Sequence, residues 1–168
     1  MGVGVEVVEE VSDELVAAFA RLMPQLSRSA DLMNAEAVGV LVEWPGSRIV
    51  VARLDGLIVG TLTLVVFPTP TGVRARIEDL LVDAAARGRG AGSALLLAAV
   101  RLASIDGAYT VDLSSHPSRA AANRLAEEFG FQVGDSRPYR LTLPRRGHHP
   151  APPERRDSQE TPDSPGRR

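Results

Sequence analysis

The sequence predicts one domain of mixed α/β class, in which a central sheet of about seven strands is flanked by about four helices. The chain has 168 residues, which is the size of one domain and enough to bury a core. Its hydrophobic content of 44% and charged content of 24% are ordinary for a globular protein. Segments with the apolar period of strands and segments with that of helices follow one another along the chain.

The first part of the chain predicts a strand and two helices. Residues 3–11 combine apolar alternation with β-branched side chains, as in a strand. Ser12 is a suitable N-cap for a helix over residues 13–23, which Pro24 is expected to follow. A second helix is predicted over residues 31–44.

The middle of the chain predicts three strands and a third helix. Residues 48–67 predict a β-hairpin, with the turn at Asp55-Gly56. Residues 74–82 predict a fourth strand, and a glycine-rich loop follows it. The helix after that loop is expected to end near Ile105, where Asp106-Gly107 closes it.

The last part of the domain predicts a fifth strand, a fourth helix and two short closing strands. The fifth strand is expected over residues 109–115, and the helix over residues 118–129 consists of strong helix formers. The closing pair is expected within residues 131–143.

Residues 144–168 form a Pro/Arg-rich tail that is expected to be disordered. They contain six prolines and no aliphatic side chain larger than alanine, so they cannot bury enough apolar surface to offset their ordering entropy. The predicted folded domain therefore covers residues 1–143.

Composition excludes several kinds of chemistry. The chain has no cysteine, so a thiolate nucleophile, a disulfide and a cysteine-ligated metal are excluded, and we expect no metal site. All 19 basic residues are arginine, which removes a lysine Schiff base. The N-terminus lacks the pattern of a signal peptide and no apolar stretch has membrane-spanning length, so we expect a cytoplasmic protein that binds no membrane.

Charge is distributed unevenly between the domain and the tail. Residues 1–143 contain 13 arginines and 17 acidic residues, whereas the tail contains six arginines and four acidic residues. An acidic body argues against a nucleic-acid partner and mildly favours a cationic substrate. Both a monomer and a homodimer remain open.

Residues 87–93, here called the glycine loop, stand where the third helix begins. Arg87 and Arg89 lie at the positive end of that helix, where acidic residues are usual. Three glycines leave the backbone free to approach a ligand, namely Gly88, Gly90 and Gly92. A pyrophosphate bound by backbone N–H groups would explain both features, whereas close strand–helix packing would explain the glycines alone.

Two common phosphate-binding loops do not fit this stretch. A Walker A loop requires a lysine, which the chain lacks. The dinucleotide-binding fingerprint G-x-G-x-x-G has a different spacing and normally follows the first strand.

The stretch RGRGAG, residues 87–92, has the R/Q-x-x-G-x-G/A form of the GCN5-related N-acetyltransferases, the GNAT family. IEDLLVD, which precedes it, resembles that family's fourth strand. SRAAANRLAEEFGF resembles its last helix, which ends in Gly-Phe at Gly130 and Phe131. The resemblance covers about residues 3–143 and implies a single GNAT-like domain that takes acetyl-coenzyme A as co-substrate.

The resemblance also implies how that co-substrate is bound. The fourth strand would separate from the fifth, so that its free backbone pairs with the pantetheine arm and an amide near Leu81 faces the thioester oxygen. The pyrophosphate would lie at the glycine loop. The implied binding residues are Leu80, Leu81, Val82, Arg87, Gly88, Arg89, Gly90, Ala91, Gly92 and Ser93.

Glu78 is the candidate catalytic base. Strand alternation would place it on the face of Leu80 and Val82, from which it could take the amine's proton through water. The alternative is a salt bridge to Arg74 or Arg76. Asp79, on the opposite face, is interpreted as structural.

The sequence departs from the family pattern in the last helix. The family carries a tyrosine four residues before the glycine of Gly-Phe, and its hydroxyl often protonates the leaving thiolate, whereas this chain has Ala126 there. Asn is frequent seven residues earlier, where this chain has Arg119. We predict an N-acetyltransferase in which a primary amine, small or peptidic, attacks the thioester directly within a ternary complex. The alternative, favoured by Ala126, is a non-catalytic acyl-coenzyme A sensor.

Overall fold

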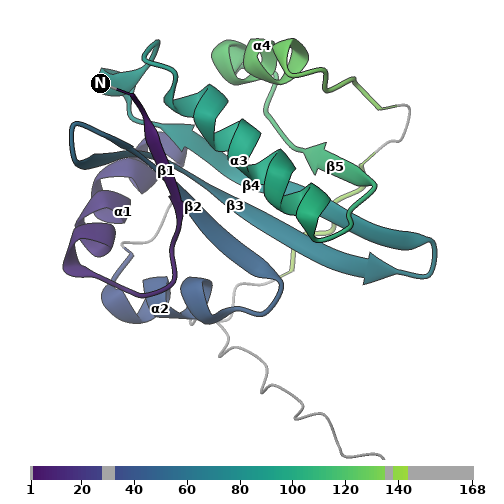
Figure 1. The fold of residues 1–168 in the computed structure, drawn as a ribbon, viewed down its shortest axis with the longest axis horizontal. Helices are drawn as coiled ribbons and strands as arrows, with labels where there is room; N and C mark the ends of the chain where they lie inside the picture. Colours follow the sequence, from purple (N-terminus) through teal and green to yellow (C-terminus); the bar gives the residue numbers. More distant parts are fainter. Residues whose placement is uncertain (1, 28–32, 135–137, 144–168) are drawn as a thin grey trace, which may run out of the picture.

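The computed structural model describes residues 2–27, 33–134 and 138–143 (Figure 1). The predicted tail, residues 144–168, lies outside the described residues, and so does the proposed boundary after residue 143. None of the described helices combines the length and the apolar character needed to cross a membrane.

The described residues form one mixed sheet of five strands, in the order β1-β2-β3-β4-β5. Their bounds are β1 (Gly4–Val7), β2 (Ser47–Leu54), β3 (Leu57–Thr69), β4 (Gly72–Val82) and β5 (Thr110–Leu113). The first four strands pair antiparallel, and β5 joins β4 in parallel. Asp55 and Gly56, with φ of 51° and 84°, make the turn between β2 and β3, which confirms the predicted hairpin.

The prediction of about seven strands is wrong, because the described parts of residues 131–143 contain no strand. Pro138 has no N–H group to donate to a ladder. The apolar side chains that closing strands would bury are exposed, with Val133 at 95%, Tyr139 at 92% and Leu141 at 86%. A short strand needs a partner and a buried face, and this segment has neither in the described residues.

Four α-helices and one short 3₁₀ helix accompany the sheet in the described part of the chain. They are α1 (Asp13–Leu26), α2 (Ala35–Glu43), η1 (Ala84–Ala86), α3 (Ala91–Ile105) and α4 (Ala120–Glu128). α1 and α2 cover one face of the sheet, whereas α3 covers the other face, with α4 beside it (Figure 1).

Each face of the sheet has its own buried cluster. On the α3 face, the helix packs small and branched residues against the strands, including Ala91, Leu95, Leu96, Ala99 and Ala103. On the other face, Leu15, Phe19 and Leu22 of α1 and Val38 of α2 pack against Ile49, Val51, Ile58 and Leu81. The apolar spacing of α1 and α3 therefore corresponds to the faces that they bury.

The start of α1 agrees with the sequence, whereas its end does not. The Oγ of Ser12 accepts a hydrogen bond from the N–H of Leu15 at 3.1 Å, as expected of an N-cap. The helix continues past Pro24 to Leu26. Pro24 falls in the last turn, where it removes one backbone hydrogen bond, and the packing of buried residues such as Leu22 still holds that turn helical.

Candidate active site

β4 and β5 separate part-way along β4. Their last paired residues are Ile77 and Leu113, whereas β4 continues to Val82. On its other side β4 remains paired with β3 as far as Gly60 and Val82. Residues 78–82 therefore have no strand partner on the β5 side within the described chain, and we call this side the open edge.

The backbone groups of Leu80 and Val82 point toward the open edge. Asp83, just after β4, donates its N–H to a carbonyl of β3 at 2.8 Å. Because backbone groups alternate in direction along a strand, those of Leu81 also face β3. The carbonyl of Leu80 accepts a hydrogen bond from Nη2 of Arg119 at 2.5 Å, which agrees with this alternation. If an amide near Leu81 faces the ligand, as expected, it therefore belongs to Leu80 or Val82 rather than to Leu81 itself.

A β-bulge at Asp79 reverses the expected face of Glu78. Asp79 has a φ of 53°, and the register between β3 and β4 shifts there. Ile77 and Leu80 consequently belong to the same buried cluster, on the α3 face. Glu78 lies on the opposite face together with Leu81, so the prediction that it shares the face of Leu80 is wrong.

The glycine loop leads into the N-terminus of α3. Gly90 is the N-cap with a φ of 85°, and Gly88 has a φ of 77°. A Cβ at either position would meet nothing within 4 Å, so these glycines are required by backbone conformation rather than by space. The N–H groups of the first helical turn, from Ala91 to Ser93, have no partner within the helix and are available to an anion.

Gly92 has a different role from the other two glycines. A Cβ there would lie 2.9 Å from Cδ2 of Leu125 in α4 and 3.6 Å from Cγ2 of Val82 in β4. Close packing therefore accounts for Gly92, as the alternative reading of the glycine loop proposed, but it does not account for Gly88 and Gly90.

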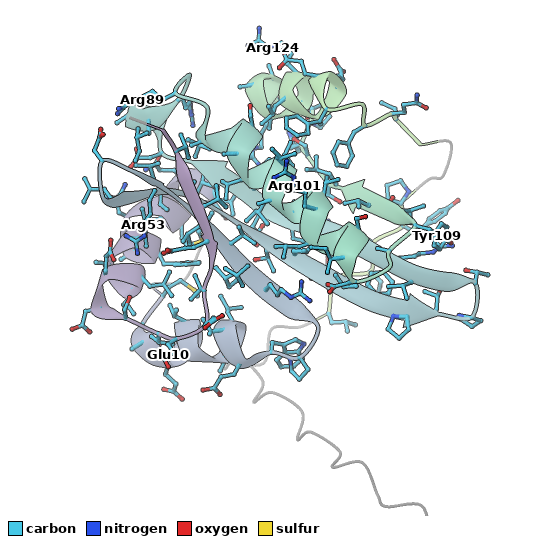
Figure 2. All side chains as sticks on the ribbon, in the orientation of Figure 1. Glu10, Arg53, Arg89, Arg101, Tyr109 and Arg124 are labelled. Atoms are coloured by element: carbon cyan, nitrogen blue, oxygen red, sulfur yellow. The ribbon has the colours of Figure 1, made fainter. Side chains whose placement is uncertain are left out.

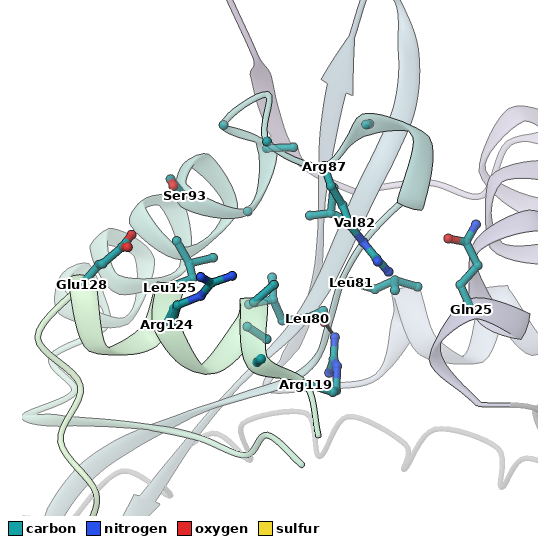
Figure 3. Close-up of a pocket in the computed structure, with 18 of the residues that line it drawn as sticks. Gln25, Leu80, Leu81, Val82, Arg87, Ser93, Arg119, Arg124, Leu125 and Glu128 are labelled. Carbon is teal, nitrogen blue, oxygen red and sulfur yellow. Dashed lines mark hydrogen bonds between the residues drawn. The ribbon is translucent and has the colours of Figure 1, made fainter. Parts of the chain in front are cut away.

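A cavity of about 750 Å³ lies between the glycine loop, the open edge and α4 (Figure 3). It is bounded at the α1 end by Gln25 and Leu26 and on the α4 side by residues from Ser118 to Glu128. Nine of the ten residues expected to bind the co-substrate line it, namely Leu80, Leu81, Val82, Arg87, Gly88, Gly90, Ala91, Gly92 and Ser93. The structure thus brings the predicted strand and loop residues together around one space.

Arg89 is the tenth predicted residue, and it does not line the cavity. It is labelled in Figure 2, and its Nη2 lies 3.0 Å from a carboxylate oxygen of Asp55 at the β2–β3 turn. This exposed ion pair joins the glycine loop to the hairpin. Such surface pairs contribute at most about 1 kcal/mol to stability.

The charged side chains that line the cavity are mainly cationic. Arg87, Arg119 and Arg124 approach it from the glycine loop and from α4, and Glu128 is the acidic residue among the described lining (Figure 3). With the free amides of α3, this lining favours a ligand with several negative charges.

The two carboxylates of β4 have different partners. Glu78 accepts a hydrogen bond from Nε of Arg76, and Nη2 of the same arginine donates to the Oγ of Ser114 at 2.8 Å. The expected alternative, a salt bridge to Arg76, is therefore present. Partial burial raises the pKa of Asp79 above its ordinary value; the Glu78 carboxylate raises it further, and Arg119 opposes both effects.

The α4 helix shows what sequence reasoning missed. Ala126 is buried, at 8% exposure, and is not among the residues that line the cavity. Arg119 does line it and contacts the open edge, although it was considered only as a departure from the family's asparagine. The sequence signal for Arg119 was its position seven residues before Ala126. The direction of its side chain, however, depends on how α4 packs.

Comparison with known proteins identifies the family. The sequence matches the Acetyltransferase (GNAT) family over residues 6–131. The chain belongs to this family. Its members are acetyltransferases that use acetyl-coenzyme A, and this chain is accordingly an N-acetyltransferase. Among curated proteins, no sequence matches the chain significantly.

Solved structures share the fold. A ribosomal-protein-alanine N-acetyltransferase from Brucella melitensis biovar Abortus 2308 has 19% identity and a TM-score of 0.72, covering 85% of this chain and 100% of its own. An acetyltransferase from Trypanosoma brucei has 26% identity and a TM-score of 0.68, covering 84% and 99%. An aminoglycoside acetyltransferase from an uncultured soil metagenomic sample, in complex with sisomicin, has 21% identity and a TM-score of 0.74, covering 84% and 97%.

The residues of the cavity fit acetyl-coenzyme A on their own chemistry. The loop amides and arginines suit its phosphates, and the open edge offers the hydrogen-bonding groups of an unpaired strand to its pantetheine amides. When bound, the co-substrate supplies an activated acetyl group as a thioester.

Proposed function

We propose that the protein transfers the acetyl group to a primary amine that approaches from the α1/α2 face of the sheet. The cavity extends from the α4 side to Gln25 and Leu26 at the end of α1, so it reaches past the edge of the sheet. Glu78 lies on this second face, at the residue where the open edge begins. Donor and acceptor would thus meet at the open edge, and direct attack requires that both are held close together in one ternary complex.

Glu78 is proposed to bind the amine and to receive its proton, directly or through water. An amine that is protonated at neutral pH cannot attack a carbonyl, so proton removal is needed before or during attack. The ion pair with Arg76 keeps this carboxylate oriented at the edge where β4 and β5 separate. With no cysteine in the chain, a covalent acetyl-cysteine is excluded.

The proposed acceptor class is supported by charge and by the similar structures. The domain is acidic overall, which favours a cationic amine. Two of the similar structures are named for ribosomal-protein alanine and for aminoglycosides, and both kinds of molecule carry amino groups. A small amine and a peptide amine are therefore the two acceptors to compare.

The observation that carries this proposal is the open edge of β4 within a cavity that reaches both faces of the sheet. The test measures release of the coenzyme A thiol over a panel of aminoglycosides, polyamines and peptides with free N-termini. Glu78→Gln should lower turnover by roughly 10²- to 10⁴-fold while coenzyme A binding is retained, and the loss should shrink at high pH.

Asp79→Asn is the matched control, since asparagine tolerates a positive φ and removes the neighbouring carboxylate. It should reduce turnover far less than Glu78→Gln. The opposite ranking would assign the base to Asp79. Coenzyme A binding without thiol release for any amine would instead favour the non-catalytic sensor.

A further inference from the structure

Arg119, the N-cap residue just before α4, occupies the open edge of β4. Its Nη2 donates to the carbonyl of Leu80 at 2.5 Å, and this hydrogen bond is partly buried (Figure 3). Within the described part of the chain, its Nε and Nη1 have no hydrogen-bond partner, although Arg119 lines the cavity. A half-buried guanidinium with donors left free beside a cavity is placed to meet a negatively charged ligand atom.

The position of Arg119 along the cavity separates it from the phosphate end. Val82 lies next to the glycine loop, because its Cγ2 is 3.6 Å from the position of a Cβ on Gly92. Leu80, which Arg119 contacts, is two residues farther along β4, or about 7 Å from Val82 at the usual rise of a strand. Arg119 therefore stands toward the end of the cavity that is remote from the phosphates.

The family's usual acid is absent from this chain, because position 126 carries alanine instead of tyrosine. Ala126 offers no donor, and Tyr139 is 92% exposed on the segment after α4. A guanidinium stays protonated in proteins, so it cannot serve as a general acid that gives up a proton. It can still stabilise an anion through its charge and its hydrogen bonds.

We propose that Arg119 stabilises the coenzyme A thiolate as it leaves, in place of an acid. This inference rests on the proposed function. The amine nitrogen forms a bond to the acetyl carbon, the carbon–sulfur bond breaks, and sulfur leaves with the electron pair. The proton of the amine goes to Glu78 or water, and the thiolate later takes a proton from water. Arg119 keeps its own protons throughout.

The other charged and titratable groups come from each element around the cavity. Asp79 of β4 is close enough for Arg119 to lower its pKa, against the larger opposing effect of burial. Arg124 and Glu128 lie on α4, Arg87 lies after η1, and His116 precedes α4 with its Nδ1 2.8 Å from the Oγ of Ser118. Of the cationic groups named here, Arg119 alone contacts the open edge among the described residues.

The test is a pH titration of coenzyme A bound to the full-length protein, followed by the ultraviolet absorbance of the thiolate. It needs no acceptor, so it is independent of the unknown amine. Free coenzyme A in the same buffer gives the reference. Bound to the wild type, the thiol should titrate about one pH unit lower than the free thiol, because a guanidinium favours its charged form. Arg119→Gln should remove most of that shift, and Arg119→Lys should retain part of it.

Arg124→Gln is the matched control, since it removes the same charge from the same helix without touching Leu80. It should weaken coenzyme A binding yet leave the titration of the bound thiol unchanged. Once an acceptor amine is known, Arg119→Gln should lower kcat by roughly 10- to 100-fold, with a smaller change in KM for acetyl-coenzyme A.

Three results would overturn the proposal or its basis. A bound thiol that titrates equally in wild type and Arg119→Gln would show that Arg119 does not face sulfur. If Arg124→Gln changed the titration of the bound thiol as much as Arg119→Gln does, the shift would come from the overall positive charge of the cavity and not from Arg119. Failure of the wild type to bind coenzyme A would refute the proposed function itself, which is a separate outcome. If Arg119→Gln does not fold, the titration of coenzyme A bound to Arg119→Lys decides the matter, and a shift as large as that of the wild type would refute the role of the guanidinium.

Discussion

The glycine-loop wall of the cavity offers an anion mainly backbone N–H groups and the positive end of α3, whereas the α4 wall offers the side chains of Arg119 and Arg124. The first wall is fixed by backbone conformation at Gly88 and Gly90. The second depends on long side chains on a short helix. The difference suggests that the loop wall sets affinity for phosphates, and that the α4 wall adjusts affinity and reactivity.

Gly90→Asp should have the largest effect on the loop wall. It places a side chain on a residue with a φ of 85° and a negative charge where we expect the pyrophosphate. Coenzyme A affinity should fall by roughly 30- to 100-fold, about 2–2.7 kcal/mol. Calorimetry measures this loss. Gly90→Asn keeps the shape without the charge and should lose much less, while unchanged affinity in a folded Gly90→Asp variant would refute the phosphate-loop assignment.

Ala126→Tyr tests the interior of the α4 wall. Because Ala126 is 8% exposed, a phenol ring there should overpack the helix and lower stability by about 1–3 kcal/mol. Denaturant unfolding gives this value. If stability were retained and turnover rose, the ring would have reached the thiolate, and the placement of position 126 away from the cavity would be wrong.

Arg124→Gln should have a moderate effect on the α4 wall. Its side chain is exposed and lines the cavity, so we expect coenzyme A affinity to fall about three- to tenfold at low salt. The difference from wild type should narrow as salt increases, because exposed charges are screened. A loss that persists in high salt would mean that Arg124 is desolvated when the ligand binds.

Gly92→Ala should have the smallest effect, and it separates packing from ligand binding. The new Cβ would approach the flexible end of Leu125, which must move, while alanine gains up to about 1 kcal/mol of helix propensity. The free energy of unfolding, measured by thermal denaturation, should therefore change by no more than about 1 kcal/mol. Pairing the change with Leu125→Ala should relieve the contact, and a strictly additive double variant would contradict direct packing of α3 against α4.

Local sequence signals predicted the elements that depend on local physics. Asp55-Gly56 predicted the hairpin turn, Ser12 predicted the start of α1, and the glycines of the glycine loop predicted the start of α3. Each follows from backbone conformations that glycine and polar residues favour within a few positions. The local pattern also predicted strands within residues 131–143. That prediction was wrong because strand pairing depends on partners elsewhere in the chain.

The sequence by itself determined the family, its acetyl-coenzyme A co-substrate and the absence of a cysteine nucleophile, because these depend on residue types and their spacing. Only the tertiary structure decided the face of Glu78 and the direction of Arg119. One extra residue at the Asp79 bulge inverts every later side chain of β4, and alternation along a strand cannot reveal such an insertion. The contact of Arg119 with Leu80 joins residues 39 positions apart, so it exists only once α4 has packed beside the open edge.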